Sequence, residues 1–397
     1  MSQIFKPVSR RTVLTALAGT TAALALMPTV GFADDEIVLG LVSPLSEPGD
    51  ARSGEAIKKT ADLWVKTIND AGGIIGRKVK LAVYDDQGKV EVGVSAMERA
   101  ITEANASAIL GVWSSSVTIA QMEVAKGYNV PLLAFYSWSD EVTSKNYPQV
   151  FRIGPYNSQI AAQMVLFVKE RGYKKVVVLA EDTAYGLGFA KAFEEAAKVL
   201  PDLSLEVVQF QAQTQDLTAH MSKIAASQPD AVIVQTVFAA TNLSIKQGRE
   251  VGLKADIITG WDWPLLPDFW PTVGEAGVGV IYPTFSDPSM TVTATGKAFI
   301  DAYKAAYGSE PAIFQYYLWD DFNAVKAAIE ATKSSEPAKL VAALPDVKFE
   351  GTIGPVFFRN EAGTVNFHQW DKFAMFFKKL NKVGDGEAQA ELVYVVK

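Results

Sequence analysis

Short apolar runs alternate with segments of helical periodicity along the first part of the chain. Residues 36–44, "EIVLGLVSP", form a β-branched run that ends at a proline, and they predict a buried strand. Residues 54–70 place Ile57, Ala61 and Trp64 on one face at helical spacing. The alternation continues with strands predicted at 79–86, 106–113 and 131–137 and helices at 89–104 and from residue 115. This order predicts a parallel sheet that is covered by helices on both faces.

The same alternation begins again after residue 157. Strands are predicted at 174–182, 205–210, 230–236, 256–261 and 277–283, with helices at 158–171, 186–199, 216–226 and 239–251 between them. Two successive units of one kind favour two similar lobes over a single very wide sheet. Helices predicted at 291–307, 316–333 and 336–343 follow, and the chain ends in β-rich sequence.

The first 33 residues have a different pattern, which predicts an export signal. Arg10 and Arg11 precede an apolar run that is too short to span a bilayer, and small residues lead to a cleavage site after Ala33. The Ser-Arg-Arg order resembles a twin-arginine signal. Val13 stands where such signals often carry phenylalanine, so the general secretory route stays open. The sequence therefore predicts an exported, soluble protein.

Composition and charge exclude several classes of function. The chain has 397 residues, which is enough for two domains, and a net charge of −7. Removal of the leader, with Lys6, Arg10 and Arg11 and no acid, makes that charge −10. Without a basic tract, nucleic acid is not an expected partner. The chain has no cysteine, so thiolate metal sites and cysteine nucleophiles are excluded.

The residue types needed for catalysis are sparse. A serine nucleophile needs a nearby base, and the only histidines, His220 and His368, have no adjacent acid placed to orient them. The segment "GVWSSSVTIA" lacks the G-x-S-x-G elbow, and "GLGFAK" lacks the third glycine of a dinucleotide fingerprint. Paired acids such as Asp85-Asp86, Glu181-Asp182 and Asp320-Asp321 are typical of strand ends and helix starts. We expect no enzymatic activity, no cofactor and no metal, with a serine hydrolase as the remaining enzymatic alternative.

Binding is better supported, because aromatic and hydroxyl side chains follow several predicted strands. Ligands of open parallel sheets bind beyond the carboxyl ends of the strands. The serines after Trp113 open a helix, whose free N–H groups favour an anion, although plain helix capping is an equal alternative. Asp262 lies between two tryptophans and suits an ammonium group or another donor. The residues expected to contact a small-molecule ligand are Trp113, Ser114, Ser115, Ser116, Tyr136, Ser137, Trp138, Tyr185, Phe238, Trp261, Asp262 and Trp263.

Several of these segments occur in an order that resembles a known family. "VSPLSEPG", "INDAGGIIGRKVKLAVYDDQ", "AILGVWSSSVTIA", "VFRIGPYNSQIAA", "VVVLAEDTAYGLGFAKAF" and "GTIGPVFFRNEAG" resemble the periplasmic solute-binding proteins of the branched-chain-amino-acid (Leu/Ile/Val-binding) type, which serve ABC importers. The resemblance implies a monomeric clamshell of two Rossmann-like lobes that closes on a ligand and docks on an inner-membrane permease. A ligand sensor for a membrane receptor is the alternative on the same fold.

The resemblance also implies a lobe division and site roles. Lobe 1 would comprise residues 34–155 and 284–351, and lobe 2 residues 156–283 and 352–397, with three crossovers near 154–157, 282–285 and 350–354. Ser114 and Ser115 match the family's carboxylate contact, Tyr185 matches its D-x-x-Y-G tyrosine, and Asp262 matches the acid that pairs with an amino group. The departures are Trp138 for a small hydroxyl residue, Ser53 for an aromatic and Trp113 for a smaller residue. They favour a planar or aromatic acid over leucine, isoleucine or valine.

Overall fold

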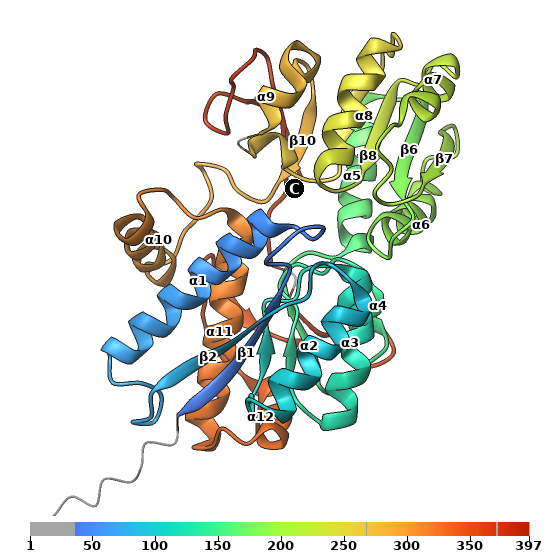
Figure 1. Ribbon diagram of the computed structural model, residues 1–397. Helices are drawn as coiled ribbons and strands as arrows, with labels where there is room; N and C mark the ends of the chain where they lie inside the picture. The colour runs from blue at the N-terminus through green and yellow to red at the C-terminus, as the bar shows by residue number, and fades with distance from the viewer. Residues whose placement is uncertain (1–35, 267, 371, 397) are drawn as a thin grey trace, which may run out of the picture. The chain divides into compact units, whose positions relative to one another are not determined.

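A computed structural model describes residues 36–397 except 267, 371 and 397, and it leaves the side chain of Phe238 undescribed. The predicted export signal, residues 1–33, lies outside the described residues. The described chain contains two seven-stranded sheets and a small hairpin of β11 (Lys348–Glu350) and β12 (Pro355–Phe357) (Figure 1). None of its helices combines the length and the apolarity needed to cross a bilayer.

The first sheet is built from the N-terminal part of the chain and one later segment. Its strand order is β13-β14-β5-β4-β3-β1-β2, and every pair is parallel except β13 with β14. The strands are β1 (Ile37–Ser43), β2 (Val79–Asp85), β3 (Ile109–Leu110), β4 (Leu132–Leu133), β5 (Val150–Ile153), β13 (Arg359–Asn360) and β14 (Phe367–Trp370).

Helices cover both faces of this first sheet. On one face α2 (Val90–Thr102) packs beside α3 (Ser115–Tyr128), and on the other α1 (Ala51–Asp70) packs beside α11 (Ile313–Thr332) (Figure 1). Every residue of β1 except Val38 is buried, as expected for a strand that is covered on both faces. The remaining helices of this part are α4 (Glu141–Ser144), α10 (Ala294–Tyr307) and α12 (Pro337–Ala343).

The second sheet has the order β16-β15-β10-β9-β8-β6-β7. Its parallel strands are β6 (Lys175–Glu181), β7 (Ser204–Phe210), β8 (Ala231–Gln235), β9 (Asp256–Thr259) and β10 (Ile281–Thr284), and β15 (Phe376–Lys379) and β16 (Glu391–Val395) are antiparallel. Successive residues of β6 face opposite sides, so Val176 and Val178 pack with α5 (Asn157–Arg171) and α6 (Gly186–Ala197). Val177 and Leu179 pack with α7 (Thr218–Ala226) and α8 (Phe238–Glu250).

This architecture confirms the predicted α/β class with two parallel sheets, but two predicted strands are much shorter than the apolar runs suggested. Strands were predicted at 106–113 and 131–137, whereas β3 and β4 have two residues each. Beyond Leu133 the Ala134 N–H still donates to the Phe151 carbonyl at 2.8 Å, and residues 135–138 then stay buried outside any strand. Burial, and not strand pairing, therefore selects the apolar residues of these segments.

The chain passes between the two sheets at three places, and the third differs from the prediction. It leaves the first sheet between β5 and α5 and leaves the second sheet after β10. Strand β14 then pairs with β5, where the buried Gln369 accepts a hydrogen bond of 2.6 Å from Arg152. The last passage therefore lies between Trp370 and Phe376. Residues 359–370 belong to the first sheet, and their predicted assignment to lobe 2 was wrong.

Candidate functional site

A cavity of about 670 Å³ lies between the loops of the two sheets. The loops after β1, β3 and β4 line it from the first sheet, and the loops after β6, β7, β8 and β9 line it from the second. All of these loops follow the carboxyl ends of parallel strands, which is the usual place for ligands in open α/β sheets. The volume falls within the range of small-molecule sites.

Most of the residues predicted to contact a ligand line this cavity. They come from four loops that are far apart in the sequence, so the fold brings together what the sequence presents separately. The predicted residues that belong to the lining are Trp113, Ser114, Ser115, Ser116, Tyr136, Trp138, Tyr185, Trp261 and Trp263.

The three serines differ in what their hydroxyl groups already contact. The Ser115 hydroxyl accepts a hydrogen bond of 3.1 Å from the Ser139 N–H, and the Ser116 hydroxyl accepts one of 3.2 Å from the Ala184 N–H. The second of these bonds joins α3 to the loop after β6, and so connects the two sheets. Ser114 is the N-cap residue of α3, but its side chain makes no capping bond. Each hydroxyl therefore still has a proton to donate.

Helix α3 presents its N-terminus at the cavity. Its cap residue Ser114 is extended, with φ −71° and ψ 126°, and no side chain caps the first turn. The Thr118 N–H is the first in the helix to bond back, to the Ser114 carbonyl at 2.8 Å. Free N–H groups and the positive end of a helix dipole attract an anionic group. The start of α3 is therefore suited to a ligand carboxylate.

Aromatic rings from both sheets pack against one another at one side of the cavity. Trp261, after β9, lies 6.1 Å from Trp113 and 5.1 Å from Tyr136, measured between ring centroids. Trp138 lies 5.6 Å from Tyr185 in an edge-to-face arrangement. These pairs cross between the sheets, and edge-to-face contacts of this kind are favourable. The cavity consequently has apolar, ring-bearing walls.

Two predicted site residues do not line the cavity, and the side chain of a third is not described. Ser137 is fully buried behind the wall, where its hydroxyl contacts Thr118 Oγ1 at 2.6 Å and donates to the Trp113 carbonyl at 3.0 Å. Asp262 is 8% exposed, is not part of the lining, and accepts a hydrogen bond of 3.2 Å from Thr284 Oγ1. Phe238 begins α8, and its side chain lies outside the part of the chain that is described.

Five charged residues of the lining, among them Glu47 before α1, were not predicted. Asp50 and Arg52 lie at the start of α1, Glu181 ends β6, and Asp268 precedes α9 (Phe269–Val273). Arg52 forms an ion pair with Asp268, which joins the two sides of the cavity. In the sequence, acids at strand ends and helix starts are most often caps, so the pattern alone carried no functional signal for them.

Burial changes the acidity of these carboxyl groups. Desolvation raises the pKa of Asp50 to about 6, against the lowering effect of its hydrogen bond with Ser53. It likewise raises the pKa of Glu181 to about 6, although Thr183 and the Val237 N–H donate to that carboxylate. For Asp262, burial and the nearby Glu387 raise the pKa well above its usual range. A positive group placed next to any of these three carboxyl groups would therefore stabilise its ionised form.

The two histidines pack against aromatic rings away from the cavity. His368 stacks on Phe151 with ring centroids 4.2 Å apart. His220, which belongs to α7, lies beside Phe210 at the end of β7. Neither histidine belongs to the cavity lining. Within residues 36–397, apart from the three undescribed positions, no cluster of three or more metal-binding side chains occurs.

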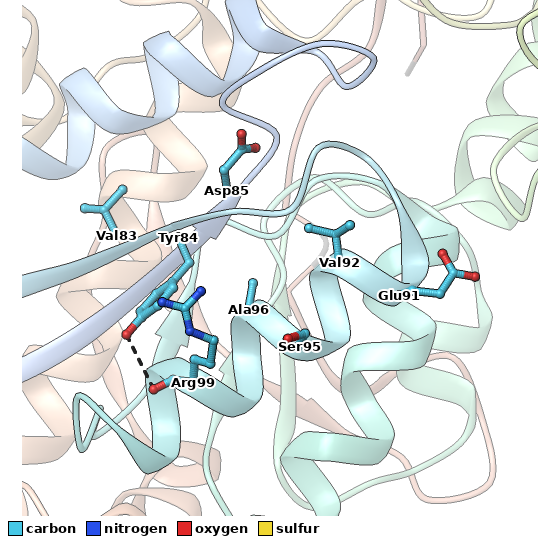
Figure 2. A pocket seen from close by; sticks show the side chains of 8 residues that line it. All are labelled: Val83, Tyr84, Asp85, Glu91, Val92, Ser95, Ala96 and Arg99. Atoms are coloured by element: carbon cyan, nitrogen blue, oxygen red, sulfur yellow. Dashed lines mark hydrogen bonds between the residues drawn. The ribbon is translucent and has the colours of Figure 1, made fainter.

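A second hollow lies on the surface between β2 and α2. Tyr84 faces Arg99 there (Figure 2). The Arg99 guanidinium carbon lies 5.1 Å from the centroid of the Tyr84 ring. Its volume is about 550 Å³, but its wall residue Val83 is 36% exposed. It draws its lining from the first sheet alone and contains none of the predicted site residues. The cavity between the sheets is therefore the better candidate site.

Comparison with known proteins agrees with this geometry. A family profile described as periplasmic binding protein matches residues 36–375. The chain is 27% identical over 358 residues to a Leu/Ile/Val-binding protein homolog of Brucella melitensis, covering 89% of this chain and 95% of that protein.

Solved structures of the same fold carry different ligands. The branched-chain amino acid binding protein LivJ of Streptococcus pneumoniae, in complex with isoleucine, has a TM-score of 0.77 and 26% identity, with 90% of this chain and 99% of that one covered. A solute-binding protein of an R. palustris ABC transporter, in complex with benzoate, has a TM-score of 0.76 and 20% identity, with coverages of 91% and 96%. Because the family profile spans most of the chain, this protein belongs to the periplasmic binding protein family, whose members bind solutes and are not enzymes.

Proposed function

We propose that the protein is the substrate-binding component of an ABC importer, which captures a small organic solute in the periplasm and delivers it to a membrane permease. The observation that carries this proposal is the cavity between the two sheets, whose lining comes from loops of both. A ligand in that cavity contacts both sheets at once. Such contacts exist only when the two sheets are close together, so the ligand favours the closed arrangement.

The ligand's carboxylate would bind at the start of α3. The first N–H groups of that helix have no side-chain cap, and the Ser114 hydroxyl is not engaged in capping. Ser115 and Ser116 each accept one bond and keep a proton for donation. A carboxylate at this place would receive charge-assisted hydrogen bonds, which are stronger than neutral ones.

The rest of the ligand would pack between aromatic rings. Trp113, Tyr136 and Trp138 from the first sheet and Trp261 from the second form the apolar wall. Relatives of this fold bind isoleucine in one case and benzoate in another. The fold alone therefore does not determine which side group the ligand carries. The aromatic walls of the cavity favour an aromatic or branched apolar group.

A thermal-shift screen tests this function directly. The purified protein, freed of bound solute, is mixed with amino acids, amides and aromatic acids, and its melting temperature is measured. A ligand present at 100 times its Kd should stabilise the folded state by about 2.7 kcal/mol, which is a shift of several degrees.

Variants of the serine segment localise the effect. Ser114→Ala should weaken the stabilising ligand by about tenfold or more, because it removes a hydrogen bond to a charged group. Ser95→Ala, in the surface hollow of Figure 2, is the matched control and should change nothing. Equal effects of both variants, or no stabilising compound in a broad panel, would refute the proposal.

A further inference from the structure

The tryptophan loop, residues 260–263 after β9, carries two rings of the cavity wall with an acid between them. Trp261 and Trp263 belong to the lining, whereas Asp262 does not. The Asp262 carboxyl group contacts the end of β10 instead, where its Oδ2 accepts a hydrogen bond of 3.2 Å from Thr284 Oγ1. Thr284 is the last residue of β10, before the chain passes to α10. The printed hydrogen bond of this side chain is therefore with β10 and not with the cavity.

Polar contacts fasten the chain beyond β10 to the rest of the second sheet. The Ser286 N–H donates to Thr284 Oγ1 at 3.2 Å, and the Ser286 hydroxyl donates to Glu387 Oε1 at 2.5 Å. Lys378, on β15, is 2% exposed, and its Nζ lies 3.7 Å from Glu387 Oε1. The same Nζ lies 3.1 Å from Asp287 Oδ2. Because removal of one partner from a buried ion pair is strongly destabilising, this segment is held firmly.

The segment after β10 also contacts a ring of the first sheet's wall. Phe285 follows Thr284 and is fully buried. Its ring centroid lies 5.7 Å from that of Trp138 and 4.9 Å from that of Phe373, both in an edge-to-face arrangement. Two adjacent residues therefore contact both walls of the cavity: the Thr284 hydroxyl bonds to the tryptophan loop, and the Phe285 ring packs on Trp138.

Burial disfavours the charged form of Asp262. The residue is 8% exposed, and desolvation, followed by the nearby Glu387, raises the pKa of its carboxyl group well above the usual range. The hydrogen bond from Thr284 lowers this pKa but does not offset the effect of burial. A carboxyl group in this state acts through its hydrogen bond more than through its charge. An amide of the same shape can therefore take its place.

We propose that Asp262 is a positioning residue: with Thr284 it holds the tryptophan loop against the end of β10, and it does not contact the ligand. This inference rests on the proposed function. It gives this acid a different role from the contact with an amino group that the resemblance implies. Rings that are held in place before binding lose less entropy when a ligand packs against them, which raises affinity. The affinity for the solute thus depends on a hydrogen bond outside the lining.

Calorimetric titration with L-isoleucine, L-phenylalanine and benzoate tests the assignment in two matched pairs of variants. Asp262→Leu and Thr284→Val remove the hydrogen bond with little change in side-chain size. Asp262→Asn and Thr284→Ser keep an acceptor and a hydroxyl group, respectively. We expect the first two variants to weaken the tightest of the three probes by about tenfold, and the second two to stay within about threefold of the unsubstituted protein.

A double variant and a control distinguish positioning from a general loss of stability. Asp262→Leu combined with Thr284→Val should bind the probe about as tightly as either single variant, because both substitutions remove the same hydrogen bond. Thr67→Val removes a hydroxyl that donates to the Leu63 carbonyl at 2.8 Å in α1, outside the lining, and should leave the Kd unchanged. The melting temperature is measured for every variant, and a lower melting temperature with an unchanged Kd would contradict the inference.

Ser286→Ala tests the next contact of the chain without leaving a buried charge. It removes the donor to Glu387 and keeps the N–H that donates to Thr284. We expect it to weaken the probe by about threefold, because the end of β10 is held less firmly. If Asp262→Leu or Thr284→Val does not fold, this variant decides, and an unchanged Kd for Ser286→Ala would then contradict the inference.

The outcomes separate this inference from the proposed function. If Asp262→Asn weakens the probe as much as Asp262→Leu does, or if Thr284→Val leaves the Kd unchanged, the positioning role is wrong. It is also wrong if none of the three probes binds, because their apolar groups are those that the ring walls favour. The solute-binding function survives each of these results as long as some compound of the broad panel binds in the cavity. It fails only if none does.

Discussion

At the scale of single residues, Arg152 is the buried side chain that fixes one wall of the cavity. It is fully buried on β5, and its guanidinium donates to the Ser137 and Ser139 carbonyls, both at 2.8 Å. These two residues flank Trp138, so the bonds hold the loop that carries this ring. Burial lowers the pKa of Arg152 to about 10, which leaves it charged at neutral pH.

Removal of this guanidinium should strongly destabilise the folded protein. Arg152→Met leaves two backbone carbonyls and the Gln369 side chain without their donor. Each unsatisfied buried group costs about 1–3 kcal/mol, so we expect a loss of at least about 3 kcal/mol in the free energy of unfolding. Urea denaturation measures it. Arg99→Met, at a side chain that is 56% exposed, is the control, and an equal loss in both variants would contradict the role assigned to Arg152.

At the scale of elements, the connection between β3 and α3 aims the serines and Trp113 at the cavity. Gly111 lies in this connection with φ +84°, a conformation that other residues adopt at a cost. A Cβ added there would lie 2.6 Å from Leu41 Cδ1. The turn therefore needs glycine for both its backbone and its packing.

Alanine at this turn should disturb both stability and binding. We expect Gly111→Ala to lower the free energy of unfolding by more than about 1 kcal/mol and to weaken the ligand, because the start of α3 moves. Gly127, within α3, has open space around an added Cβ, so Gly127→Ala should be neutral or stabilising by up to about 1 kcal/mol. Denaturation and ligand titration of the two variants make the comparison. A neutral Gly111→Ala would refute the argument.

Elements were predictable from the sequence where periodicity and burial agree. The helical spacing of Ile57, Ala61 and Trp64 predicted α1, and all three side chains are buried. Periodicity did not predict that β14 joins the first sheet, because that assignment depends on pairing between segments about 215 residues apart. Among the site residues, Ser137 and Trp138 are neighbours in one buried run. Only the fold decides that Trp138 lines the cavity and that Ser137 does not.

The acids of the site could not be identified from sequence for a related reason. Asp50 and Glu181 have the residue type and the position of ordinary caps, and each does make capping or turn hydrogen bonds. Their second property, a place in a shared cavity, arises only when the loops after β1 and β6 come together. The spacing of residues along the sequence therefore does not show which acids line the cavity, whereas the folded structure does.

At the scale of the whole molecule, buried acids set the pH dependence of stability. Burial raises the pKa of Asp50, Asp86 and Glu181 to about 6, and that of Asp320 to about 7. Between pH 7 and pH 5 the folded chain takes up protons at these groups, whereas the unfolded chain does not. As the pH falls from 7 to 5, each group that titrates fully should therefore add about 1 kcal/mol to the free energy of unfolding. His368 opposes this, because burial lowers its pKa to about 4.

The ligand-free protein should therefore be more stable at pH 5 than at pH 7.5. The four raised carboxyl groups outweigh the single histidine over this range. Urea denaturation at the two pH values measures the difference, and Asp320→Asn should reduce it, because this substitution removes one of the titrating groups. A protein that loses stability steadily from pH 7.5 to pH 5 would contradict the role given to these acids.

The central claim is that a solute binds between the two sheets, and a crystal structure of the protein with its best stabilising ligand tests this most directly. We predict electron density for the ligand inside the cavity, with its anionic end at the start of α3 and atoms in contact with residues from both sheets. Density for that ligand outside the cavity, or contact with one sheet only, would contradict the account.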